Sequence, residues 1–307
     1  MPLSVVINTK NAAATLLRTL RSVEKIADEI VVVDMFSTDR TLEIARTFTS
    51  DIYNFKRDVG YVEPARNFAL SKATKEWILL LDADEEVPPA LAKYIGDVTQ
   101  SVESHDDKSK ESVYFLPRKN MIFGQWIENS GWWPDYQLRL FRKGTVEWRP
   151  EIHSQPDFEK ATAEYLPAQE QLALLHYNYG TVSEYIERLN RYTNQESKSK
   201  TISSGLHPVK VFSAEFLRRF FDQHGYKDGM IGSSVSLLQA MYMLTVHLKS
   251  WENDKSKGAT SISNAASAIH EVTSFRAELS YWLADYEVSR ASGINKLYWR
   301  VRRKYKI

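Results

Sequence analysis

The first third of the chain alternates short apolar runs with segments in which apolar residues recur at helical spacing. The runs that we expect to be strands lie at 3–9, 29–34, 51–55 and 76–84. Between the first two, the helical repeat of three to four residues is followed by Leu16, Leu17, Leu20 and Val23. Strands that alternate with helices in this way predict a parallel sheet covered by helices.

Polar residues stand where these expected strands end. Thr9 closes the first strand, Asp34 closes the second, and Asp82 and Asp84 close the fourth. In sheets of this kind, ligands bind at the carboxyl ends of the strands. The pattern therefore predicts that three separate strands deliver polar groups to one edge of the sheet.

The fourth run raises a question of charge. In EWILLLDADEE, residues 76–86, an apolar strand leads into the carboxylates of Asp82, Asp84, Glu85 and Glu86. Neighbouring carboxylates repel and a buried unpaired charge is costly, so we expect a positive group beside them. Asp82 and Asp84 point the same way from a strand, which suits Mg²⁺ or Mn²⁺ completed by phosphate and water. Solvated acids that cap the strand are the structural alternative.

The rest of the chain divides into two parts. The runs at 113–124 and 136–144 are expected strands, with the aromatic-rich segment QWIENSGWWPD between them. From about residue 181 the pattern is helical. We therefore expect a ligand-binding and catalytic domain over residues 1–180 and a helical region for oligomer or membrane contact over residues 181–307.

Composition narrows the class of protein. With 43% hydrophobic residues, the chain of 307 residues can bury a full core. Lys and Arg number 40 against 39 Asp and Glu, so we expect no nucleic-acid partner. The absence of Cys excludes disulfides and thiolate metal sites. The N-terminus lacks signal-peptide features and no uninterrupted apolar run is long enough to span a membrane, so we expect a cytoplasmic protein without a transmembrane helix.

Several segments together resemble one family. LSVVINTKN, EIVVVDMFSTDRT, PARNFAL and EWILLLDADEEV resemble the family 2 glycosyltransferases of GT-A fold, and most of all the bacterial branch of lipopolysaccharide-core β-glucosyltransferases. The resemblance continues through GWWPDYQLRLFRKGTVEWRPEIHSQP and GYKDGMIGSSVSLLQAMYML, and it covers roughly residues 3 to 251. It implies an α/β fold with a Rossmann-like mixed, mostly parallel sheet flanked by helices, and a C-terminal helical extension.

The resemblance also implies roles for the residues at the strand ends. Thr9 and Asp34 match positions that hold the base and ribose of a nucleotide sugar, and Arg66 matches an arginine beside the nucleotide. Asp82 and Asp84 match the motif that binds the metal ion and diphosphate. For Asp34 a helix-capping role stays open, and for Arg66 a place on a helix surface.

Other matched residues lie in the later part of the expected catalytic domain. Asp135 stands where such enzymes place the catalytic base, and His153 falls in a motif that often reads His-Glu, although Ser154 replaces the acid here. Arg139, Arg142 or His153 would add positive charge beside the diphosphate, or would form structural salt bridges. Two roles, stacking on sugar faces or filling the core, stay open for Trp126, Trp132 and Trp133.

The activity implied is inverting, metal-dependent transfer of a sugar from a UDP-sugar to an envelope glycan or lipid-linked saccharide. A protein or peptide acceptor is the alternative within this class. A nucleotidyltransferase would carry a Gly-rich loop after the first strand, where this chain reads NTKNAAATL. A non-catalytic nucleotide-sugar-binding protein is the third class, and the presence of Asp34, Asp82, Asp84 and Asp135 together argues against it.

Two features of the helical region point to partners. An apolar face at i, i+4 spacing, made by Phe212, Phe216 and Phe220, suits a subunit or domain interface and suggests a homo-oligomer. The terminus KLYWRVRRKYKI has six basic residues, three aromatic residues and no acid. Because that composition suits an anionic lipid surface, we expect peripheral contact with the inner membrane face, with a solvated basic tail as the alternative.

Overall fold

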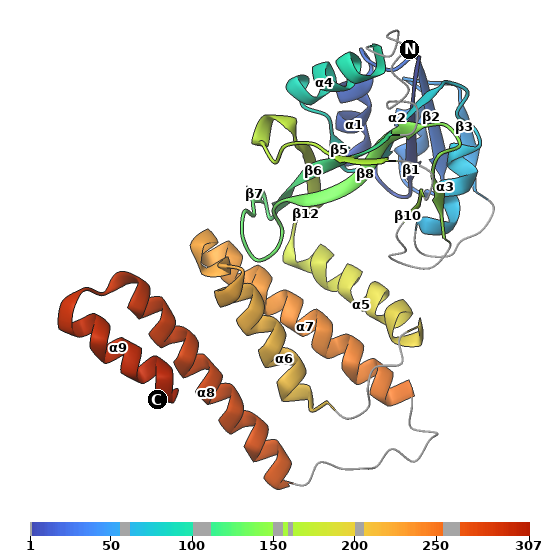
Figure 1. Ribbon diagram of the computed structural model, residues 1–307. Coiled ribbons are helices and arrows are strands. Elements are labelled where there is room, and N and C mark those ends of the chain that lie inside the picture. Colours follow the sequence, from blue (N-terminus) through green and yellow to red (C-terminus); the bar gives the residue numbers. More distant parts are fainter. Residues whose placement is uncertain are drawn as a thin grey trace. The chain divides into compact units, whose positions relative to one another are not determined.

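The chain forms two compact units. The computed structural model describes residues 2–55, 62–100, 112–149, 156–158, 162–199, 206–253 and 265–307. The sheet unit comprises Met1–Glu128 and Trp132–Gly180, and the helical unit comprises Asn129–Gly131 and Thr181–Ile307. In Figure 1 the sheet unit runs from blue to yellow-green, and the helices of the helical unit run from yellow to red.

One mixed sheet organises the sheet unit. Its main path has the strand order β3-β2-β1-β4-β8-β6-β12-β5. The strands on this path are β1 (Leu3–Thr9), β2 (Glu29–Asp34), β3 (Ile52–Asn54), β4 (Trp77–Asp82), β5 (Glu85–Glu86), β6 (Ser112–Ile122), β8 (Asp135–Arg142) and β12 (Leu174–Tyr179). β3, β2, β1 and β4 pair in parallel, β8 is antiparallel to both β4 and β6, and β12 is parallel to β6.

The other described strands are short. β7 (Gln125–Trp126) pairs antiparallel and β11 (Thr162–Tyr165) pairs parallel with β6. β9 (Glu147–Trp148) and β10 (Pro156–Asp157) form a separate antiparallel pair. The mixed, mostly parallel sheet with flanking helices confirms the fold class predicted from the sequence.

The parallel part of the sheet is buried on both faces, as its continuous apolar runs require. Val5 and Ile7 of β1 pack into one core with α1 (Leu16–Val23) and α4 (Pro89–Gln100), to which α2 (Thr41–Ala45) also contributes. Val6 points to the other face, where it packs with α3 (Glu63–Leu70). Successive residues of one strand therefore anchor helices on opposite faces, which holds the strand ends in place.

The helical unit is built from α5 (Val182–Ser199), α6 (Pro208–Leu217), α7 (Gly229–Asn253), α8 (Ala265–Arg290) and α9 (Gly293–Tyr305). A π-helical turn at Arg218–Asp222 and a 3₁₀ turn at Gly225–Asp228 join α6 to α7. α7 contacts α5 and α6, and α8 contacts α6 and α9. The rings of Phe212, Phe216 and Phe220 stack along α6, and Phe221 stacks on Trp282 of α8 at 5.9 Å between ring centroids.

Residues 129–131, from the loop between β7 and β8, belong to the helical unit. The Asp228 carboxylate accepts the backbone and side-chain N–H groups of Asn129, both at 2.8 Å. Arg219 donates to the Ser130 carbonyl at 2.7 Å. Gly225 packs so closely that an added Cβ would lie 2.3 Å from the Ser130 hydroxyl. We call these five residues the loop clamp.

One stretch of helix meets the length and composition expected of a membrane span. Within the part of the chain that the structure describes, Gly225–Asn253 passes this test, with a mean hydropathy of 1.3. Core helices of soluble proteins pass the same test, so the result is weak evidence.

Candidate active site

The ends of three parallel strands lie level at one edge of the sheet. Thr9 of β1 is opposite Asp34 of β2, and Asn8 of β1 is opposite Asp82 of β4. The predicted meeting of polar groups from separate strands is therefore confirmed. This pairing register follows from the apolar runs of the parallel strands, because the polar side chains come directly after the last apolar residue of each run.

Some of these buried polar atoms have no hydrogen-bond partner among the described residues. They are Asn8 Oδ1, Thr9 Oγ1, Asp34 Oδ1 and Arg66 Nη1. The other oxygen of Asp34 accepts the Ser37 N–H at 3.0 Å in the turn after β2. Because α2 begins only at Thr41, this contact is not a helix cap. Because buried polar groups are almost always paired, a cluster of unsatisfied atoms at a sheet edge indicates the place of a polar ligand.

Three arginines neutralise Asp82 and Glu85 at the end of β4 and in β5. Asp82 accepts from Arg66 at 3.0 Å and from Arg139 through its other oxygen. Glu85 is fully buried and accepts from Arg139 at 2.8 Å and from Arg118 at 3.2 Å. The positive charge that the sequence required beside these two acids is therefore supplied by the protein itself.

This arrangement changes the acid–base behaviour of the cluster. Burial on its own would raise the pKa of Asp82, but the guanidinium groups of Arg139, Arg66 and Arg118 outweigh it and hold this pKa far below its usual range. Burial opposes the charge of Arg139 as well, yet Asp82 and Glu85 raise its pKa. Asp82 and Arg139 therefore stay charged throughout the physiological range.

Asp135, the expected catalytic base, begins β8 directly opposite Arg118 of β6. Its Oδ2 accepts from Arg118 Nε at 2.8 Å and from Asn120 Nδ2 at 3.0 Å, and its Oδ1 accepts from Gln137 at 2.8 Å. Burial favours a higher pKa for Asp135, but the charge of Arg118 and these hydrogen bonds lower it overall. The carboxylate is therefore ionised at neutral pH.

Asn120 connects Asp135 to a histidine that the sequence interpretation missed. Its side chain is fully buried, and its Oδ1 lies 2.6 Å from Nδ1 of His176 in β12. The other ring nitrogen of His176 lies 3.6 Å from the carboxylate of Asp84. If Nδ1 donates to Asn120, Nε2 is left to face Asp84 either as a lone pair or as a charged N–H.

The donor set allows a two-residue metal site and nothing larger among the described residues. No group of three or more His, Asp and Glu side chains in that part of the chain gathers around a point where a metal ion would fit. Asp82 has both oxygens on arginines, whereas Asp84 and His176 face each other. A carboxylate and an imidazole oriented by a second hydrogen bond fit a divalent ion that takes its remaining ligands from phosphate and water.

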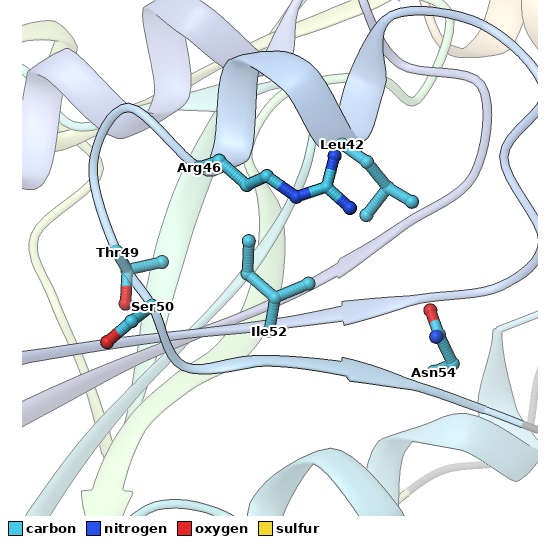
Figure 2. Close-up of a pocket in the computed structure, with 6 residues that line it drawn as sticks. All are labelled: Leu42, Arg46, Thr49, Ser50, Ile52 and Asn54. Carbon is cyan, nitrogen blue, oxygen red and sulfur yellow. The ribbon is translucent and has the colours of Figure 1, made fainter.

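A cavity of about 310 Å³ lies against the arginine cluster. Its lining includes Arg66, Arg118, Arg139, Gln137 and Trp148. A larger pocket of about 430 Å³ lies between α2 and the edge strand β3, and Figure 2 shows it lined by Leu42, Arg46 and four neighbours. Because it contains none of the candidate site residues, we place the chemistry at the smaller cavity.

Of the other residues expected from the sequence to act at the site, Arg139 lies in the arginine cluster and Arg142 lies at the other end of β4. Arg139 is 2% exposed and faces Asp82 and Glu85. Arg142 pairs with Glu76 at the other end of β4, in a structural salt bridge. The rings of Trp126 and Trp133 meet edge to face at 5.4 Å. His153 lies outside the described residues.

The sequence analysis missed Glu85, Arg118, Asn120 and His176 as members of this site. A signal was present for two of them, because Arg118 and Asn120 are two residues apart in the strand VYFLPRKNMI and so share one face. Nothing in the sequence indicated that this face of β6 lies beside Asp135, because β6 and β8 meet only through sheet pairing.

The fold and the site define the class first. A mixed sheet whose parallel strand ends present Thr9, Asp34 and the DAD motif is an enzyme domain of the GT-A type. Residues 4–148 match the model of glycosyl transferase family 2. The protein is a glycosyltransferase.

The chain is also similar to individual proteins. The chain is 28% identical over 251 residues to an uncharacterised glycosyltransferase of Rickettsia bellii, covering 75% of this chain and 81% of the relative. It is 25% identical over 281 residues to the lipopolysaccharide core biosynthesis glycosyltransferase LpsC of Rhizobium meliloti, covering 87% and 98%. The structure of S. aureus TarS 1-349 in complex with UDP is similar with a TM-score of 0.42 and 15% identity, covering 84% of this chain and 92% of that chain.

Proposed function

We propose that the protein transfers a sugar from a nucleotide-sugar donor, a UDP-sugar, to a saccharide or lipid-linked acceptor of the cell envelope. The observation that carries this proposal is the set of unsatisfied buried atoms on Thr9, Asp34 and Arg66 at the sheet edge. A uracil and its ribose offer the donors and acceptors that these atoms lack. The match of residues 4–148 to the family 2 model supports the reaction class.

In this proposal Thr9 and Asp34 hold the nucleoside, and Arg66 stands between the nucleoside and the diphosphate. Asp82 contributes by fixing Arg66, to which it is hydrogen-bonded at 3.0 Å. Arg139 is held by the same Asp82 carboxylate and by Glu85, to both of which its guanidinium bonds. The three arginines together give the site the positive field that a leaving diphosphate requires.

Asp84 and His176 would hold a divalent cation. Mn²⁺ suits this pair better than Mg²⁺, because imidazole nitrogen favours transition metals whereas carboxylate suits both ions. When bound, the ion would neutralise charge on the leaving diphosphate. Asn120 orients the ring of His176 through its Nδ1 at 2.6 Å, as hydrogen-bond partners of metal-binding histidines do.

Asp135 is proposed as the base that takes the proton from the acceptor hydroxyl. It is ionised because Arg118, Asn120 and Gln137 all donate to it. A single base and a single displacement at the anomeric carbon invert its configuration. The acceptor class is supported by similarity to LpsC, a protein named for lipopolysaccharide core biosynthesis.

Titration calorimetry with UDP tests the proposal. Asp34→Asn removes the charge but keeps an oxygen that can still accept the Ser37 N–H, so the fold should survive. We expect UDP to bind the wild type and to bind Asp34→Asn and Arg66→Gln about tenfold or more weakly, the loss typical of one charged hydrogen bond. Arg46→Gln, in the pocket of Figure 2, is the matched control and should bind UDP like the wild type. Equal affinity in all four proteins would refute the assignment.

A further inference from the structure

The last helix of the chain exposes its apolar residues. On α9, Ile294 is 86% exposed, Leu297 62%, Tyr298 54%, Val301 47% and Tyr305 62%. Their spacing of three, four, seven and eleven residues from Ile294 places them on one face of the helix. A helix that served only as part of a soluble unit would bury such a face.

The opposite face of α9 packs against α8. Arg303 donates to Asp285 of α8 at 2.6 Å, and Trp299, four residues earlier on the same side, is half-buried. The helix is thus oriented with a charged side toward the protein and an apolar side toward the surroundings. Figure 1 shows α9 lying alongside α8 at the C-terminal end of the chain.

The charge around this apolar face has one sign. Residues 293–307 contain six basic residues, namely Lys296, Arg300, Arg302, Arg303, Lys304 and Lys306, and no acid. Arg303 pairs with the side chain of Asp285, and Arg302 donates to the oxygen of Ile307 at 2.8 Å. On a helical wheel Arg302 and Lys304 flank the apolar face on its two sides.

We propose that α9 lies on the surface of an anionic phospholipid bilayer, with Ile294, Leu297 and Val301 in the interface and its basic residues on the headgroups. An apolar face flanked by arginine and lysine, with tyrosines at its border, has the chemistry of an interfacial helix. A second copy of the chain is a poorer occupant, because pairing this face with itself would bring two sets of six basic residues together.

Vesicle sedimentation with the full chain tests the proposal. Vesicles of phosphatidylcholine with phosphatidylglycerol are compared with vesicles of phosphatidylcholine alone, at low and high salt. We expect binding to the anionic vesicles only, weakened by salt. Leu297→Ser/Val301→Ser should weaken binding at least tenfold through lost apolar burial. Arg300→Gln/Lys304→Gln should weaken it about 25-fold, at about fivefold per charge. Met230→Ser, which removes an 85% exposed apolar residue from α7, should bind like the wild type.

The outcomes separate the possible occupants. Circular dichroism first establishes that each variant is folded. Equal binding of the wild type and Leu297→Ser/Val301→Ser to anionic vesicles would overturn the proposal. The proposal would also be overturned if sedimentation velocity showed a dimeric wild type and a monomeric Leu297→Ser/Val301→Ser variant while both proteins bound vesicles equally. No nucleotide is present in these measurements, so the result is independent of the proposed transferase reaction.

Discussion

Arg118 is the residue that joins the acid cluster to the proposed base. Its guanidinium contacts Asp135 at 2.6 Å and Glu85 at 3.2 Å, and Asp82 lies 4.0 Å away. The desolvation of Arg118 by burial is outweighed by these acids, which raise its pKa. The positive charge of Arg118 therefore persists beside Asp135 and favours its ionised form.

We predict that Arg118→Gln moves the acidic limb of the pH–rate profile to higher pH. The folded pKa of Asp135 is lowered, so in the wild type the carboxylate becomes protonated only below the usual carboxyl range. Removing the Arg118 charge leaves burial as the main influence, which raises that pKa. The measurement is kcat/KM for sugar transfer between pH 4 and 8.

Two companion variants make this test specific. Arg118→Lys keeps the charge and should leave the limb close to its wild-type position. Asp135→Asn removes the base and should lower transfer about 10²-fold or more while UDP-sugar binding stays near normal. A limb that does not move in Arg118→Gln, or an Asp135→Asn protein with wild-type transfer, would show that the base lies elsewhere.

At the scale of elements, the loop between β7 and β8 is held by the turn between α6 and α7. The loop clamp fixes Asn129 and Ser130 through Asp228 and Arg219, four to six residues before Pro134 and Asp135 along the chain. Gly225 is required for this contact because it lies against the hydroxyls of Ser130 and Ser236.

We predict that Gly225→Ala destabilises the protein. The added Cβ would lie 2.3 Å from Ser130 Oγ, 2.6 Å from Ser236 Oγ and 2.8 Å from the Arg219 carbonyl. Overpacking of this kind costs about 1–3 kcal/mol of unfolding free energy, which urea denaturation can measure. Gly96→Ala in α4 is the control, because its Cβ would meet nothing within 4 Å and alanine favours a helix by about 0.5–1 kcal/mol. Wild-type stability of Gly225→Ala would contradict the tight contact.

At the scale of the whole molecule, ligand binding should be visible as thermal stability. A ligand at 100 times its Kd stabilises the folded state by about 2.7 kcal/mol, which raises Tm by roughly 5–10 °C for a domain of this size. We expect UDP with Mn²⁺ to raise Tm more than UDP alone, and EDTA to remove the difference.

His176→Ala tests whether Asp84 and His176 hold the ion. The part of the Tm increase that depends on Mn²⁺ should disappear in this variant, whereas UDP alone should still stabilise it. Glu86→Gln is the control, because Glu86 bonds to Tyr177 at 2.9 Å outside the proposed metal pair. A Mn²⁺ effect that survives in His176→Ala would mean that the cation binds elsewhere.

The sequence by itself determined the parallel half of the sheet and the polar edge. Short apolar runs of strand length, separated by segments with helical spacing of apolar residues, are local signals in the sequence. They place Thr9, Asp34 and Asp82 at the ends of β1, β2 and β4. Because parallel strands in such a sheet end together, the polar edge could be predicted without knowing any long-range contact.

Only the tertiary structure decided how the acids are neutralised. Arg118 and Asn120 reach Asp135 because β6 pairs with β8, and His176 reaches Asp84 because β12 lies between β6 and the two-residue strand β5. These pairings join residues far apart in the chain, and strand propensity does not specify which strands become neighbours. The sequence called for a positive group beside EWILLLDADEE, and the order of the sheet supplied arginines to Asp82 and Glu85 while leaving Asp84 beside a histidine.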